Sequence, residues 1–234
     1  MSAIFKRELH TYFTTASGYV FLAVFYALSG FFLFSVNLAG STTDLGGLFS
    51  TLLLVWVFLI PILTMRLLSE ERRQKTDQLL LTAPVRLFDI VFGKFLAALT
   101  IFGAGIGIVV IYALVLAGLG RVDFWATVGS FIGIILLGAA LISIGLFISS
   151  LTENQVVSAV ASIFIMLILY LIDSISSAVN NAVVSAIVTN ISIFSRFKNF
   201  SLGVFNLGDT VFYISVAALF LFLTVRLLEK RRWA

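Results

Sequence analysis

The chain has 234 residues, of which 61% are hydrophobic and 11% are charged, and its mean hydropathy is +1.15. This composition excludes a soluble domain, because so few polar side chains could not cover a water-facing surface. It predicts one membrane domain with room for about six helices of ~20 residues. We attribute the formal net charge of +4 to membrane topology rather than to nucleic-acid binding, because basic residues gather in cytoplasmic loops.

Residues 1–16 predict a short amphipathic helix on the cytoplasmic membrane surface. Apolar residues recur at helix-like spacing with charged residues between them, namely Ile4, Phe5, Leu9, Tyr12 and Phe13 against Lys6, Arg7, Glu8 and His10. The alternative is a charged lead-in to the first span, because periodicity in so short a window is weak. A cleavable signal peptide is disfavoured, since the uncharged run 11–43 exceeds the ~7–15 residues of a signal-peptide core.

Six long apolar segments follow, and we expect each to cross the membrane as a helix. Pro61 should kink the second span near its cytoplasmic end. Gly103 and Gly107 form a GxxxG pair that allows close helix packing, either within the subunit or at an interface. The predicted spans are residues 17–38, 45–65, 92–119, 124–151, 155–172 and 209–228.

The stretch after the fifth span, residues 174–195, is long enough for a seventh span, but its many Ser, Thr and Asn side chains are costly against lipid. The basic residues favour six spans, because twelve then lie inside and three outside, which is a strong positive-inside signal. Residues 173–208 are therefore predicted to form external amphipathic or re-entrant helices, with both termini cytoplasmic. The inside set is Lys6, Arg7, Arg66, Arg72, Arg73, Lys75, Arg86, Lys94, Arg226, Lys230, Arg231 and Arg232, and the outside set is Arg121, Arg196 and Lys198.

The long charged island of the chain lies in residues 66–94, of which 66–91 are predicted to be cytoplasmic. Helix-spaced charge pairs, Glu71 with Lys75 and Arg73 with Asp77, predict a helix that leaves the membrane after the second span. The run LLL at 79–81 is an apolar knob in a charged rim. It fits two interpretations equally well on physical grounds: a hairpin whose leucines tuck under the bundle, or a docking element for a cytoplasmic partner.

Residues 70–85, EERRQKTDQLLLTAPV, resemble the segment after the second span of ABC-2 type transporter permeases, where E-E-x-x-x-G-T-x-E-L-L-L-T-x-P-[VI] is usual. The departures are Lys75 in place of a common glycine and Gln78 in place of a common glutamate. The matching positions are Glu70, Glu71, Thr76, Leu79, Leu80, Leu81, Thr82, Pro84 and Val85. Residues 195–209, SRFKNFSLGVFNLGD, are similar to the R-F-x-x-F-x-x-G-[VI] stretch of the gliding-motility-associated subgroup of these permeases.

The resemblance implies an all-α integral membrane protein with six transmembrane helices in the ABC-2 (type V exporter-like) fold, with an N-terminal interface helix and re-entrant external helices between spans 5 and 6. It implies three sets of site residues. The set for coupling to an ATPase is Glu70, Glu71, Thr76, Asp77, Leu79, Leu80, Leu81, Thr82, Pro84 and Val85; the interface-helix set is Phe5, Lys6, Arg7, Leu9 and Tyr12; the external-gate set is Arg196, Phe197, Phe200 and Gly203.

By the same resemblance, the chain is a non-enzymatic permease subunit that moves or extracts a substrate by alternating access, powered by a separate ATPase. The expected partners are two copies of an ABC ATPase, a second permease subunit in a homo- or heterodimer, lipid, and as a further candidate an extracytoplasmic accessory subunit; no nucleic acid is expected. The expected location is the bacterial cytoplasmic (inner) membrane. We expect ATP and magnesium on the ATPase, and no cofactor, metal or catalytic residue on this chain, which lacks a GxxxxGK[ST] loop.

A stand-alone channel or ion-coupled carrier is the alternative function. Such a protein needs charged or polar groups deep inside its spans, and the predicted spans contain almost none. An intramembrane enzyme is disfavoured, because the chain has no Cys, a single His10 and neither a GxSxG nor an HExxH motif. Glu153 and Asp173 lie at span ends, where solvation is a better explanation than an ion relay.

Overall fold

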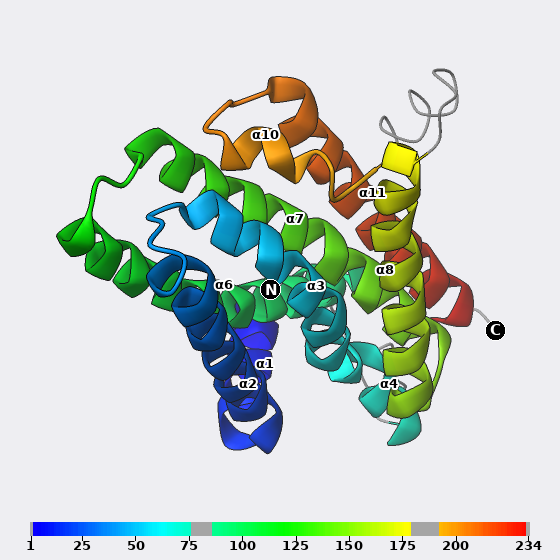
Figure 1. Ribbon diagram of the computed structural model, residues 1–234. Coiled ribbons are helices and arrows are strands. Elements are labelled where there is room, and N and C mark those ends of the chain that lie inside the picture. Colours follow the sequence, from blue (N-terminus) through cyan, green and yellow to red (C-terminus); the bar gives the residue numbers. More distant parts are fainter. Residues whose placement is uncertain (1, 76–85, 179–191, 233–234) are drawn as a thin grey trace.

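The computed structural model describes residues 2–75, 86–178 and 192–232, which form a bundle of helices (Figure 1). Six helices in these ranges are long and apolar enough to cross a membrane, so the predicted all-α fold with six spans is confirmed. They are Ala16–Leu38, Leu45–Arg73, Leu87–Leu119, Phe124–Leu151, Gln155–Ile172 and Leu207–Arg232.

Some of these spans consist of more than one helical element, and shorter helices flank them. The elements in chain order are α1 (Ser2–Thr14), α2 (Ala16–Phe32), the π-helix η1 (Leu33–Leu38), α3 (Leu45–Thr64), α4 (Arg66–Arg73), α6 (Leu87–Leu119), α7 (Phe124–Leu151), α8 (Gln155–Ala178), α10 (Phe197–Ser201) and α11 (Leu207–Arg232).

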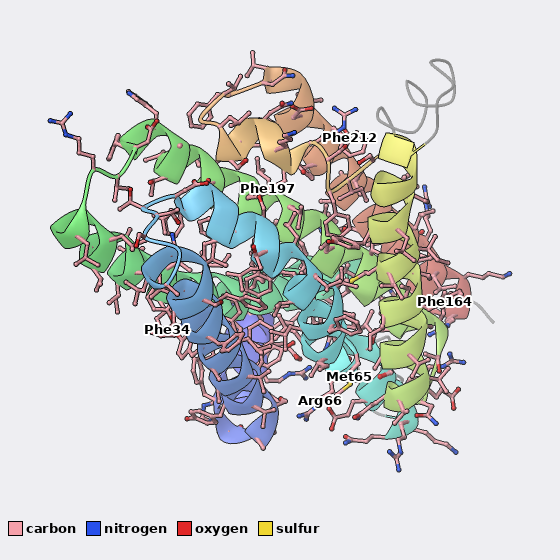
Figure 2. All side chains as sticks on the ribbon, viewed as in Figure 1. Phe34, Met65, Arg66, Phe164, Phe197 and Phe212 are labelled. Atoms are coloured by element: carbon pink, nitrogen blue, oxygen red, sulfur yellow. The ribbon has the colours of Figure 1, made fainter. Side chains whose placement is uncertain are left out.

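Helices α3 and α7 form the centre of the bundle, and α2 and α8 lie on its outside (Figure 1). Trp56 of α3 is fully buried, with its ring centroid 4.3 Å from that of Phe25 and 4.5 Å from that of Phe102. Such ring pairs stabilise a core beyond the area they bury. By contrast, Phe34 and Phe164 point outward on opposite sides of the bundle (Figure 2) and are 61% and 63% exposed, as expected of side chains that face lipid or another subunit.

Aspartate side chains begin the two central helices. Asp44 accepts hydrogen bonds from the first backbone N–H groups of α3, and Asp123 does the same for α7. Each carboxylate satisfies donors that have no partner inside their helix and complements the positive end of the helix dipole. The turns before α3 and α7 are therefore the starts of the two most buried spans.

The bundle has two distinct ends, because α7 runs from a contact with α10 to a contact with α4 (Figure 1). We call them the α10 end and the α4 end. Helix α1 lies at the α4 end, where Arg7 pairs with Glu71 of α4. The last turn of α11 lies there too, because the Arg231 guanidinium donates to the backbone oxygen of Ser150 near the end of α7. The first and last helices thus meet the same end of the bundle.

The second span is divided at Met65 into α3 and α4, although the backbone of Met65 is itself helical, with φ of −53° and ψ of −32°. Met65 N donates to Pro61 O at 2.8 Å, so the helix continues past the proline, and α4 begins one residue after Met65. The predicted helix-spaced pair of Glu71 with Lys75 is wrong, because α4 ends at Arg73 and Lys75 has a left-handed backbone with φ of 56°. Its predicted companion, Arg73 with Asp77, lies partly outside the described residues.

Candidate functional site

A buried lysine connects three helices at the α4 end. Lys94, on the second turn of α6, has a side chain that is 1% exposed. Its Nζ atom lies 3.0 Å from Glu8 Oε1 of α1 and 2.9 Å from Glu71 Oε1 of α4. A lysine buried to this degree without partners would be strongly destabilising. The two carboxylates therefore hold α1 and α4 against the start of α6.

An arginine completes the arrangement. Arg7 Nη2 lies 2.9 Å from Glu8 Oε1 and 2.6 Å from Glu71 Oε1, which are the same oxygens that Lys94 contacts. Arg7, Glu8, Glu71 and Lys94, called the Lys94 cluster below, thus alternate two cations with two carboxylates. The formal charges cancel, as a buried ionic group requires.

The cluster changes the acidity of its members on α1. Burial alone would raise the pKa of the Glu8 carboxyl, but the charge of Lys94 and hydrogen bonds from Arg7 and Lys94 outweigh burial and leave that pKa below its ordinary value. Burial alone would lower the pKa of Arg7, but Glu8 and Glu71 raise it overall. Both shifts favour the charged forms, so Glu8 and Arg7 stay ionised near neutral pH.

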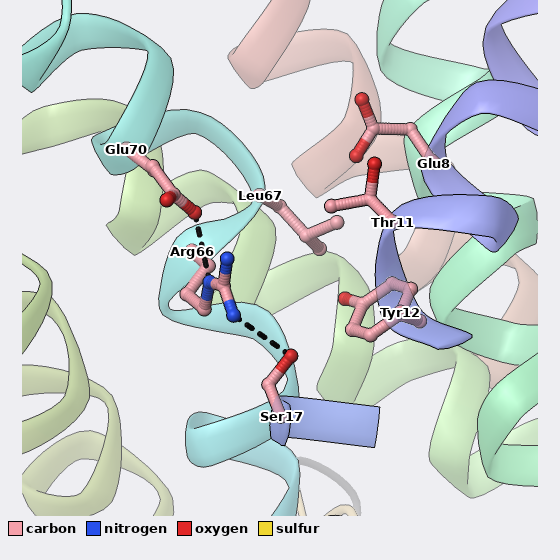
Figure 3. Close-up of a pocket in the computed structure, with 7 residues that line it drawn as sticks. All are labelled: Glu8, Thr11, Tyr12, Ser17, Arg66, Leu67 and Glu70. Carbon is pink, nitrogen blue, oxygen red and sulfur yellow. Dashed lines mark hydrogen bonds and ion pairs between the residues drawn. The ribbon is translucent and has the colours of Figure 1, made fainter. Parts of the chain in front are cut away.

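A second set of contacts joins the start of α4 to the junction of α1 and α2 (Figure 3). Arg66 donates to Glu70 Oε2 at 2.8 Å and to Ser17 Oγ at 2.9 Å, and the Tyr12 hydroxyl donates to Leu63 O at 2.7 Å. Burial raises the pKa of Tyr12, so its hydroxyl keeps its proton and remains a donor. A polar hollow of about 30 Å³ between these helices has room for about one water molecule.

Helix α4 is also attached on its other side, to the turn between α7 and α8. Arg72 donates to Leu151 O at 3.0 Å and pairs with Glu153 at 2.9 Å. The solvated interpretation of Glu153 is therefore incomplete, since its carboxylate, although exposed, has a partner on α4. The segment 76–85 is thus flanked by residues that contact the rest of the bundle. Residues 66–75 contact α1, the junction of α1 and α2, and the turn between α7 and α8, and residues 86–94 contact α1 through Lys94.

The α10 end carries a separate polar contact, which joins the segment before α11 to α11 itself. Asp209, at the start of α11, is 3% exposed and accepts from Arg196 Nη1 at 2.6 Å and from Asn199 Nδ2 at 2.7 Å. The Arg196 guanidinium also lies 4.1 Å from the centroid of the Phe212 ring, a favourable cation–π contact.

Two phenylalanines of the segment before α11 are packed inside the bundle. Phe197 and Phe200 are buried, and they pack against α7 where Gly133 has no side chain; a Cβ there would lie 2.5 Å from the Cβ of Phe200. Gly203 has a φ of 73°, which is the left-handed region that glycine enters without strain. The segment is therefore a packed cap on this end of the bundle.

Comparison with known families agrees with this architecture. The family model described as ABC-2 family transporter protein matches residues 3–228, which is nearly the whole chain. The protein belongs to the ABC-2 transporter family. No curated protein matches the chain. As an ABC-2 permease, the chain is a membrane transport subunit and is not itself catalytic. The family match does not test the gliding-motility subgroup, which stays a prediction.

The structure of this ABC-2 permease places part of the predicted coupling set. Glu70 and Glu71 lie on α4, where each forms an ion pair. The other members, Thr76, Asp77, Leu79, Leu80, Leu81, Thr82, Pro84 and Val85, lie outside the described residues.

The interface-helix set divides between two faces of α1. Phe5, Leu9 and Tyr12 pack onto the hydrophobic core, whereas Lys6 is exposed and Arg7 joins the Lys94 cluster. Much of the apolar face of α1 is therefore covered by the protein itself. In the gate set, Arg196, Phe197, Phe200 and Gly203 are brought together in the cap at the α10 end.

Two members of the Lys94 cluster, Glu8 and Lys94, were missed as site residues from the sequence. Glu8 was assigned to the polar face of α1, and Lys94 was used as a topology marker. The contact between them spans 86 positions of the chain, so no local spacing could have predicted it. The available signal was that Lys94 stands within an apolar helical run, where a charge needs a partner.

Proposed function

We propose that this protein is the membrane subunit of an ATP-driven ABC transporter, in which a separate ATPase docks on residues 76–85 and drives alternating access. The α4 end is then cytoplasmic and the α10 end external, and the membrane is the bacterial cytoplasmic membrane. Two ATPase copies and a second permease subunit complete the assembly, with an extracytoplasmic accessory subunit as a further candidate. ATP and magnesium bind the ATPase.

The observation that carries this proposal is the attachment of the chain on both sides of residues 76–85. A segment that receives force must transmit it, and force applied to a loop free of the bundle would be lost in that loop. Here α4 before the segment and α6 after it share the buried Lys94, and α1 joins both through Glu8 and Arg7. Displacement of the segment is thereby passed to two spans and to α1.

The charge distribution supports the proposed orientation. The start of α6, α1, α4 and the last turn of α11 lie at the α4 end and carry most of the basic residues, as cytoplasmic segments do. The alternative of a channel or ion-coupled carrier finds less support. Among the described residues, the buried charged side chains are Glu8, Lys94 and Asp209, and each lies near an end of the bundle rather than at its middle.

The experiment that tests the proposal is co-purification of the tagged permease with its ATPase from native membranes. We expect an ABC ATPase to co-purify with the wild-type chain and to be lost with Leu80→Asp, because a carboxylate in an apolar anchor of an interface is costly to desolvate. Leu202→Asp is the matched control, since Leu202 is 67% exposed at the α10 end. Unchanged assembly of the Leu80→Asp variant would contradict the proposed docking segment.

A further inference from the structure

The hydroxyl of Ser149 lies at the junction between α3 and α4, although Ser149 belongs to α7. In a continuous helix each N–H donates to the carbonyl four residues earlier. Here the N–H groups of Leu68 and Ser69 donate to Ser149 Oγ at 3.2 and 3.1 Å. The same hydroxyl donates its own proton to Met65 O at 3.0 Å. A side chain of α7 therefore bridges the break in the second span.

This hydroxyl is fully used. A serine Oγ has one proton to donate and two lone pairs to accept with, and the three contacts of Ser149 engage all of them. Ser149 is 0% exposed, so water does not compete for these positions. Its removal would leave the two buried N–H groups of Leu68 and Ser69 without this acceptor, and buried N–H groups rarely lack a partner. The carbonyl of Met65 would keep the hydrogen bond that the Ser69 hydroxyl donates to it.

Ser149 supplies the cap that α4 does not supply for itself. The first four N–H groups of a helix have no partner within it, and Leu68 and Ser69 are the third and fourth residues of α4. The residue at the usual capping position is Met65, and α4 has no side-chain cap of its own. Ser149 thus performs, from a neighbouring helix, the role that Ser or Asp normally performs at a helix start.

The same face of α7 also contacts the end of α3. Gly145 lies one turn before Ser149, and a Cβ at Gly145 would overlap the side chain of Thr64, the last residue of α3. The backbone of α7 therefore presses directly on the final turn of α3, and the Ser149 hydroxyl enters the junction next to it. The bond that Pro61 removes is the one to the carbonyl four residues earlier, whereas the altered bonds lie beyond Met65, whose N–H still donates to Pro61 O.

We propose that Ser149 is a positioning residue whose hydroxyl pins a hinge between α3 and α4 and so sets the angle at which α4 leaves the bundle. Insertion of a side chain into the helix ladder is a recognised cause of sharp helix kinks. The inference rests on the proposed function for its meaning, because α4 leads into the proposed docking segment. It adds that the angle of α4 is controlled by a helix that neither contains nor flanks that segment.

The test measures the position of α4 with a pair of spin labels. Because the chain has no cysteine, Arg73→Cys and Val156→Cys provide two unique labelling sites, both of them exposed, on α4 and α8. A change of about 20° at the hinge would move the far end of an eight-residue helix, about 12 Å long, by about 4 Å. Pulsed electron–electron double resonance, which measures the distance between two spin labels, resolves such a change.

In the isolated permease, we expect Ser149→Ala to shift or broaden the distance distribution by about 4 Å. The matched controls are Ser143→Ala and Ser150→Ala, which remove buried hydroxyls that donate only to carbonyls within α7; both should leave the distribution unchanged. If the Ser149→Ala and wild-type distributions superimpose, the hinge is refuted. Gly145→Ala keeps every hydroxyl but pushes on Thr64, so it should also displace α4, and an unchanged distribution here would contradict the proposal independently.

A second readout separates positioning from general stability. In the complex with the ATPase, addition of a non-hydrolysable ATP analogue should change the wild-type distance, and Ser149→Ala should abolish this change while the ATPase still co-purifies. A Ser149→Ala complex that responds to the nucleotide like the wild type would overturn the positioning role. Failure of the wild-type permease to bind any ATPase would instead refute the proposed function, and the comparison in the isolated permease would still decide on the hinge.

Discussion

Replacement of Lys94 by methionine is the sharpest single test of the cluster that joins α1, α4 and α6. Methionine is of similar length and fits an apolar site, but it leaves Glu8 and Glu71 with Arg7 as their remaining partner in the cluster. Arg7 is itself half exposed, so it compensates less than the buried lysine does. The variant therefore measures the cost of partly buried carboxylates that have lost the more buried of the two cations in the cluster.

The expected size of the effect follows from burial. Lys94 is 1% exposed and lies 2.9–3.0 Å from two carboxylate oxygens, and removal of one partner from a buried ion pair costs about 3–5 kcal/mol. For a chain of this length each kcal/mol corresponds to about 2–4 °C. The thermal unfolding midpoint should therefore fall by about 6–20 °C.

The assay is thermal unfolding of the purified permease in detergent, followed by tryptophan fluorescence. The double variant Lys94→Met/Glu71→Gln restores the charge balance, so it should be more stable than Lys94→Met alone, by about 1–2 kcal/mol. Lys6→Met is the matched control, because Lys6 is exposed on α1 and should change stability by less than about 0.5 kcal/mol. A Lys94→Met midpoint equal to that of the control, or a double variant less stable than the single one, would refute the reasoning.

Three further predictions concern pH, backbone strain and packing. The folded-state pKa of Glu8 lies below the ordinary value of 4.5. The ionised Glu8 therefore contributes fully to stability above about pH 4.5, and this contribution is lost as the pH falls below that value. The thermal unfolding midpoint of Glu8→Gln should accordingly drop less on acidification than that of the wild type. Lys75→Gly should raise the midpoint by about 2–4 °C, because a non-glycine residue in the left-handed region costs about 1 kcal/mol; an unchanged or lower midpoint would count against this strain. Gly133→Ala should lower stability by about 1–3 kcal/mol, because the added methyl group would overlap Phe200. Gly107→Ala should not lower stability, because a Cβ at Gly107 would have no other atom within 4 Å. Equal effects of the two substitutions would contradict the close packing of the cap.

The number and course of the spans could be predicted from the sequence, because hydropathy and charge act locally. Each apolar run of about twenty residues must satisfy its backbone hydrogen bonds as a helix, and the described structure has six such helices. The position of the break in the second span could not be predicted. Pro61 carried the visible signal for a kink, whereas α3 and α4 divide at Met65, where a hydroxyl of another helix accepts from two backbone N–H groups of α4.

The contacts of the candidate site depend on pairs of residues far apart in the chain. The charges of residues 66–77 suggested helix-spaced pairs, but Glu71 contacts Arg7 and Lys94 instead, across 64 positions in the first case. Ser149 illustrates the same limit, because nothing in the sequence distinguishes it from Ser143 or Ser150. Lys75 is the opposite case: the glycine usual at this position of the related motif already indicated a special backbone, and the positive φ of Lys75 gives the reason.

The most direct test of the central claim is site-specific photo-crosslinking in native membranes. A photo-reactive amino acid at position 80 should give an adduct with an ABC ATPase, whereas the same amino acid at position 202, which is exposed at the α10 end, should not. This result would show both the docking segment and the side of the membrane on which it acts. An ATPase adduct at position 202, or none at position 80 in a complex that contains the ATPase, would contradict the account.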